Sequence, residues 1–176
     1  MDTNDIVYQM KKPIGHSVKV GLLALTATIG FDLFLHAGVL NPLYSGADPF
    51  LLSPEESFQR IPLGYLSFAI LTIMILWLMN RLEIEGWKRG LVFGLIIGGL
   101  VWGSLVLGLF SISTAKPLLL IAWFLGQTAE LGISGMVIGS GLAAEKLRPL
   151  LVKVLIFFVI AVILGIVIQN IWNSTP

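Results

Sequence analysis

The residues best placed to do chemistry lie in the stretch 116–144, which is apolar and long enough to cross a bilayer yet carries Gln127 and Glu130 near its middle. A carboxylate at the centre of a membrane helix costs roughly 2.5–3.5 kcal/mol on insertion scales, so it seldom faces lipid without a partner or a purpose. Trp123, Gln127, Glu130 and Ser134 follow one another at helical spacing, which places them on one face. We predict that this face turns toward the protein interior.

A second polar stripe occurs in the first apolar segment, where Thr28, Asp32 and His36 recur at every fourth residue. At 1.5 Å per residue, Asp32 lies about 12 Å and Gln127 about 15 Å from the ends of their helices on the same side of the membrane. The two stripes therefore carry polar groups at similar depth. If the two helices are neighbours, one polar pocket is surrounded by Asp32, His36, Trp123, Gln127 and Glu130, with Ser134 on the same face and Trp102 as a candidate apolar wall.

Three functions are compatible with such a pocket. In the first, Asp32 and Glu130 are protonatable carboxylates that couple proton movement to the transport of a small solute or ion, with a tryptophan as an apolar or cation–π wall. In the second, Asp32, His36 and Glu130 bind a divalent metal ion, which could support ion passage or a metal-dependent membrane enzyme. In the third, these groups satisfy one another, and the protein is an accessory or scaffold subunit. The sequence favours transport over the accessory role, and both over the enzyme.

The composition indicates a membrane protein. Of the 176 residues, 56% are hydrophobic and only 12% are charged, whereas soluble domains have about 25% charged residues. A net charge of +1 gives no clustered basic face, so nucleic-acid binding is excluded. The absence of cysteine excludes thiolate catalysis, iron–sulfur clusters and cysteine-ligated zinc. No established catalytic motif is present, and the sequence predicts no cofactor apart from the candidate divalent metal ion.

The apolar segments predict an all-α bundle in a single transmembrane domain. Its five helices are expected at residues 18–40, 62–80, 90–111, 117–143 and 150–172. Residues 1–17 should form a short polar tail. The longest connection, 41–61, contains a capping box at Ser53 and Glu56 with Pro54 at the first helical position, so a short helix over 54–60 is expected on the membrane surface.

Glycine recurs at helical spacing in two of these segments, a pattern typical of close packing between membrane helices. The expected packing residues are Gly90, Gly94, Gly98 and Gly103 in the third helix and Gly135 and Gly139 in the fourth. The pattern does not say whether the partner helix belongs to the same chain. A homo-oligomer or a larger membrane complex therefore stays open.

The basic residues predict the orientation of the bundle. Lysine and arginine are frequent before the first helix, between the second and third, and between the fourth and fifth, whereas the other two connections offer only Arg60 and Lys116. Basic segments remain on the cytoplasmic side. We therefore expect a cytoplasmic amino terminus, an external carboxyl terminus, and a location in the cytoplasmic (inner) membrane of a prokaryote.

Overall fold

The structure, a computed structural model, describes residues 13–44 and 50–174, and all regular secondary structure in these ranges is helical. Its elements are α1 (Ile14–Asp32), the π-helix η2 (Leu33–Val39), α2 (Asn41–Tyr44), α3 (Pro54–Arg81), α4 (Trp87–Ile112), α5 (Pro117–Ala143) and α6 (Arg148–Ser174). Within the described residues, five helical stretches are long and apolar enough to cross a membrane. The predicted all-α class and the five candidate spans are thus confirmed, and they support an integral membrane protein.

The first span differs from the regular helix predicted over 18–40. It begins four residues earlier, at Ile14, because the carbonyl of Pro13 accepts hydrogen bonds from the N–H groups of His16 and Ser17. Proline itself needs no N–H partner at such a position. The span also changes after Asp32 from an α-helix to a π-helix, the wider turn with hydrogen bonds between residues five apart.

The second span corrects the prediction of a separate short helix over 54–60. The predicted capping box is present, since the N–H of Glu56 donates to Ser53 Oγ at 3.2 Å and the Glu56 carboxylate accepts from the N–H of Ser53 at 3.3 Å. The helix then continues through Pro62 to Arg81. An internal proline lacks one backbone donor, here the one that would reach the carbonyl of Phe58, and membrane helices tolerate this loss.

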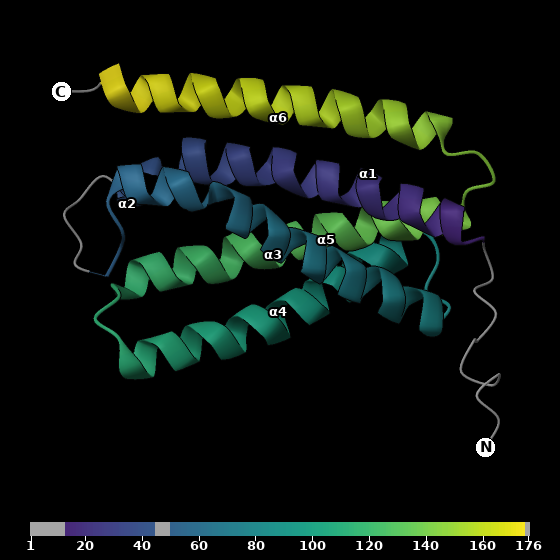
Figure 1. The fold of residues 1–176 in the computed structure, drawn as a ribbon, viewed down its shortest axis with the longest axis horizontal. Helices are drawn as coiled ribbons and strands as arrows, with labels where there is room; N and C mark the ends of the chain where they lie inside the picture. The colour runs from purple at the N-terminus through teal and green to yellow at the C-terminus, as the bar shows by residue number, and fades with distance from the viewer. Residues whose placement is uncertain (1–12, 45–49, 175–176) are drawn as a thin grey trace.

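The helices cross the molecule back and forth (Figure 1). In this view α6, α1, α5 and α4 lie in that order, while α3 passes across α1 and α5. The most extensive packing joins α4 to α5, and α5 also contacts α1, α3 and α6. Among the five spans of the described chain, α5 has the largest buried share. The helix that carries Gln127 and Glu130 is therefore the central helix of the bundle.

Turns and helix ends gather at two opposite ends of the bundle (Figure 1). The beginning of α1 shares one end with the α3–α4 and α5–α6 connections, and we call this the His16 end. The α4–α5 connection, α2 and the end of α6 lie at the other, which we call the Tyr44 end.

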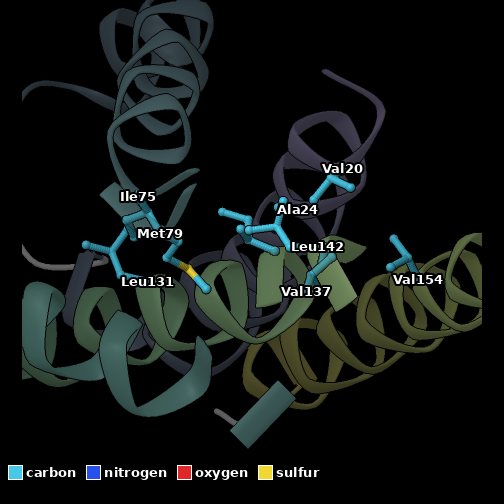
Figure 2. Close-up of a cluster of buried hydrophobic side chains, with 10 residues drawn as sticks. Val20, Ala24, Ile75, Met79, Leu131, Val137, Leu142 and Val154 are labelled. Carbon is cyan, nitrogen blue, oxygen red and sulfur yellow. The ribbon is translucent and has the colours of Figure 1, made fainter. Parts of the chain in front are cut away.

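Ten buried apolar side chains pack into one cluster inside the bundle (Figure 2). It joins α1, α3, α5 and α6. Its members are Val20, Ala24, Ala27, Ile75, Met79, Leu131, Val137, Ile138, Leu142 and Val154. Most of them come from the first half of α1 and the second halves of α3 and α5. The cluster therefore packs hydrocarbon between α1, α3, α5 and α6 on the side of the bundle that leads to the His16 end.

Glycines bring the backbones of α4 and α5 together. A Cβ atom added to Gly90 would overlap the carbonyl of Gly135, and one added to Gly94 would overlap the carbonyl of Leu131. In the other direction, a Cβ at Gly139 would lie 2.5 Å from the carbonyl oxygen of Gly86. Backbones this close gain dispersion contacts that larger residues would prevent.

The close approach ends before the last glycine of the series. A Cβ at Gly98 would still lie 3.0 Å from the Cα of Thr128 on α5. At Gly103 it would meet only the ring edge of Phe124 at 3.5 Å, an ordinary van der Waals contact. Gly103 therefore lies outside the tight part of the interface, because the two helices have diverged by that level.

Candidate functional site

The end of the first span positions two of the polar side chains. Asp32 is the last residue of α1, and His36 lies within η2. Their side chains meet, with Asp32 Oδ1 3.7 Å from His36 Nε2. The widened π turn changes the direction in which η2 presents its side chains relative to a regular helix, and π turns within helices are often found at functional sites.

Close packing between the first span and α5 brings the other polar groups to the same place. A Cβ at Gly126 would overlap the side chain of Leu35, and a Cβ at Gly141 would lie 2.6 Å from a methyl group of Val20. These two contacts are fifteen residues apart on each helix, from 20 to 35 and from 126 to 141. The two helices are therefore antiparallel and in register over this length, which sets Asp32 level with the segment around Glu130.

Asp32, His36 and Glu130 form what we call the carboxylate–histidine centre. His36 Nε2 lies 3.7 Å from Glu130 Oε1 and equally far from Asp32 Oδ1. One ligand atom from each of the three residues lies within 4.8 Å of the other two. Two carboxylates and an imidazole from different helices thus converge on one point inside the bundle.

The amide of Gln127 joins the imidazole to one of the carboxylates. Its Nε2 lies 3.0 Å from His36 Nε2 and 3.4 Å from Glu130 Oε1. As an amide nitrogen is only a donor, His36 Nε2 accepts in this arrangement and the ring proton is on Nδ1. The lone pair of Nε2 therefore faces the two carboxylates.

The other ring nitrogen of His36 bonds to Tyr44 of α2, which lies in the connection 41–61 between the first two predicted helices. His36 Nδ1 lies 2.5 Å from the hydroxyl of Tyr44, which also accepts a hydrogen bond from Trp123 Nε1 at 2.9 Å. The ring of Phe50 covers Trp123 at a centroid distance of 6.2 Å. Burial raises the pKa of Tyr44 to about 12, so its hydroxyl stays neutral at physiological pH. Tyr44 lies two four-residue steps after His36, but the sequence predicts that the first helix ends at residue 40, so its polar stripe does not include Tyr44.

The centre is short of hydrogen-bond donors. Within the described residues, Glu130 Oε2 and Gln127 Oε1 are buried and have no hydrogen-bond partner. Side-chain exposure decreases from 24% for His36 and 16% for Asp32 to 0% for Glu130. The centre is thus reached from the His36 side, and Glu130 lies at its closed end.

Two hydroxyl groups lie beyond Glu130. Ser134 is one turn further along α5, and the helix register places Thr28 of α1 at the same level. Both side chains are buried, and neither hydroxyl has a hydrogen-bond partner in the part of the chain that the structure describes. The polar stripe therefore continues past the centre until it reaches the apolar cluster.

Trp102 does not join the polar stripe. It lies on α4 and packs against the buried apolar cluster, and its indole N–H has no hydrogen-bond partner among the described residues. Of the two candidate tryptophans, only Trp123 is bonded to the network around His36.

The chain matches no known protein family, and neither the curated proteins nor the solved structures include a significant match to it.

The chemistry of the centre therefore follows from its own atoms. The three acceptor atoms are His36 Nε2 and one carboxylate oxygen each from Asp32 and Glu130. The amide nitrogen of Gln127 lies close to two of them, His36 Nε2 and Glu130 Oε1. Such a set is stable when a positive species, a proton or a metal ion, is shared among the acceptors.

Proposed function

We propose that this chain is an integral membrane protein that binds and translocates a small cation through the carboxylate–histidine centre, in exchange with or coupled to protons. The observation that carries this proposal is the position of His36 Nε2, 3.7 Å from a carboxylate oxygen of both Asp32 and Glu130. Ionisable residues within membrane spans usually mark ion paths or proton relays.

The energy of burial supports a cation as the ligand. Glu130 is fully buried in a helix that spans the membrane, and a second acid, Asp32, lies within 4.8 Å of the centre's other ligand atoms. Two like charges this close repel each other, and each loses hydration. A bound cation or proton offsets both costs, whereas an anionic or purely apolar ligand would offset neither.

Unequal access to the two ends supports translocation. His36 is 24% exposed and lies in η2, next to α2 at the Tyr44 end, whereas the apolar cluster packs on the side of Glu130 that leads to the His16 end. Alternating exposure of a buried site requires such a one-sided state. In the proposed orientation, with the His16 end in the cytoplasm of a prokaryotic cell, the structure represents an outward-facing state.

The competing role as an accessory subunit has lost its main support. That hypothesis relied on glycine faces that would dock another protein. In the described chain, the glycine face of α4 is covered by α5. The metal-dependent enzyme has no additional observation in its favour.

Flux through reconstituted protein tests the proposal. Proteoliposomes would carry a pH-sensitive dye inside, and a gradient of protons or of a metal cation would be imposed across the membrane. We expect flux from the unmodified chain and its loss in Glu130→Gln and Asp32→Asn. Glu55→Gln is the matched control, because Glu55 is exposed in the first turn of α3. Equal flux from Glu130→Gln and the control would refute the proposal.

A further inference from the structure

We propose that the cation bound at the carboxylate–histidine centre is a divalent first-row transition-metal ion such as Zn²⁺, held by Asp32, His36 and Glu130 and by the side-chain oxygen of Gln127. This inference rests on the proposed function and names the class of its substrate. It adds a fourth ligand, an expected geometry and a selectivity that the general proposal does not contain.

The spacing of the three primary ligands fits such an ion. Metal–ligand bonds of about 2.0–2.2 Å in a tetrahedral site put neighbouring ligand atoms about 3.4 Å apart. The observed separations of His36 Nε2 from the two carboxylates are 3.7 Å, and all three ligand atoms lie within 4.8 Å. A small rotation of the Asp32 and Glu130 side chains would close the site around one ion.

Gln127 supplies an independent sign of a ligand. Its side chain is only 6% exposed, and Oε1 has no hydrogen-bond partner among the described residues. Its amide group nevertheless points at the centre, with Nε2 beside both His36 and Glu130. The oxygen and nitrogen of a glutamine amide exchange places by a half-turn of the amide. After this turn, Oε1 faces the same point as the three other ligand atoms.

His36 makes the kind of hydrogen bond that a metal-bound histidine usually makes through its other ring nitrogen, here to the hydroxyl of Tyr44. A histidine ligand usually donates its other ring N–H to an acceptor, which fixes the tautomer and orients the ring. Trp123 Nε1 can only donate, so the hydroxyl oxygen of Tyr44 accepts from it and keeps a second lone pair for His36 Nδ1–H. Nε2 then carries no proton, and its lone pair becomes available to a metal ion once the Gln127 amide has turned.

The ligand types set the selectivity. One imidazole nitrogen with carboxylate and amide oxygens suits Zn²⁺, Mn²⁺, Fe²⁺ or Co²⁺. Ca²⁺ prefers six to eight oxygen ligands, and Mg²⁺ prefers a nearly ideal octahedron of oxygens with several waters. The chain contains no cysteine, and no thiolate is available to select Cu⁺.

Direct binding measurements on the full chain in detergent test this inference. After treatment with a chelator, the protein would be titrated with Zn²⁺ by calorimetry, and with Co²⁺ by visible absorption, which reports the coordination geometry. We expect one ion per chain and a spectrum typical of a four-coordinate nitrogen and oxygen site. Mg²⁺ and Ca²⁺ in excess should not displace the bound ion.

Variants identify the ligands. His36→Ala should weaken Zn²⁺ binding at least 100-fold. Tyr44→Phe keeps every ligand but removes the hydroxyl that orients the His36 ring, and it should weaken Zn²⁺ binding about 10-fold. His16→Ala is the matched control. His16 is the chain's other histidine; it lies near the beginning of α1 and donates to the carbonyl of Gly141. Helical circular dichroism would verify that each variant is folded, and His36→Gln replaces any His36→Ala protein that is not.

The results separate this inference from the proposed function. Zn²⁺ binding that is lost in His36→Ala and retained in His16→Ala supports the metal site, whether or not the reconstituted protein shows flux. Flux of protons that depends on Glu130, in a protein that binds no Zn²⁺, overturns the metal site and leaves the proposed function intact. Binding that is equally strong in His36→Ala, or equally strong for Mg²⁺, also overturns it.

Discussion

His36 Nε2 lies 3.7 Å from the carboxylate of Glu130, although 94 residues separate the two in sequence and Glu130 is fully buried. The pair joins a π-helix at the end of the first span to the central helix of the bundle. Because Asp32 approaches the same nitrogen, the relationship defines a site with three acceptors and not a simple ion pair.

The hydrogen bonds at Tyr44 should stabilise the fold as well as the site. Tyr44→Phe leaves Trp123 Nε1 and His36 Nδ1 without their acceptor, which should cost about 1–3 kcal/mol. Trp123→Phe should cost less in the Tyr44→Phe background than alone, since both changes remove one shared bond. The free energies of unfolding of the unmodified chain, the two single variants and the double variant, measured in mild detergent, give the coupling between the two residues. Strictly additive losses would show that the bond does not contribute.

The ionisation of Tyr44 should appear at high pH. Its pKa in the folded protein, about 12, lies above the ordinary value of 10.0. The neutral hydroxyl therefore contributes stability that is complete below pH 10 and is lost as the pH rises toward 12. The melting temperature of the unmodified chain should therefore fall more steeply over this pH range than the melting temperature of Tyr44→Phe. Parallel curves would contradict the burial of this hydroxyl.

The α4–α5 interface should tolerate no added methyl group at its glycines. Gly94→Ala places a Cβ on the carbonyl of Leu131 and should destabilise the protein by about 1–3 kcal/mol. Gly99→Ala is the matched control, because a Cβ there meets nothing within 4 Å. Gly99→Ala should be neutral or slightly stabilising, since alanine favours helix. Equal stability of the two variants would show that the helices are farther apart.

The apolar cluster should contribute strongly to stability. Ile138 on α5 is completely buried, and Ile138→Ala should cost about 2–5 kcal/mol through lost burial and a residual cavity. Ile163 on α6 is 54% exposed, so Ile163→Ala offers the same chemical change at a site with little packing. Thermal unfolding of the two variants measures the difference. Similar melting temperatures would mean that the His16 end is not close-packed.

Some of this arrangement could be predicted from helical spacing. The four-residue steps from Thr28 to His36 and the stripe from Trp123 to Ser134 follow from helix geometry and depend on no tertiary contact. Asp32 and the segment near Gln127 lie at similar depth, as predicted, because the rise per residue is constant in a helix. The cost of a buried acid then favoured adjacency of the two helices, and they are adjacent.

Other features depend on tertiary contacts that a pattern does not encode. Tyr44 reaches His36 through a π-helix and the short α2, and the sequence predicts neither of these elements. Trp102 lies deep in its helix, as a residue that lines a pocket would, but its side chain packs against the apolar cluster. The prediction of a separate helix over 54–60 was wrong, because the helix continues through Pro62, where the loss of one backbone donor is tolerated.

Charge movement on addition of a cation tests the central claim most directly. Reconstituted protein on a solid-supported membrane would be exposed to a rapid jump in Zn²⁺ concentration or in pH, and the current recorded. We predict a transient current with the unmodified chain and with Glu55→Gln, and its loss in Glu130→Gln. An undiminished current in Glu130→Gln would contradict cation movement through the carboxylate–histidine centre.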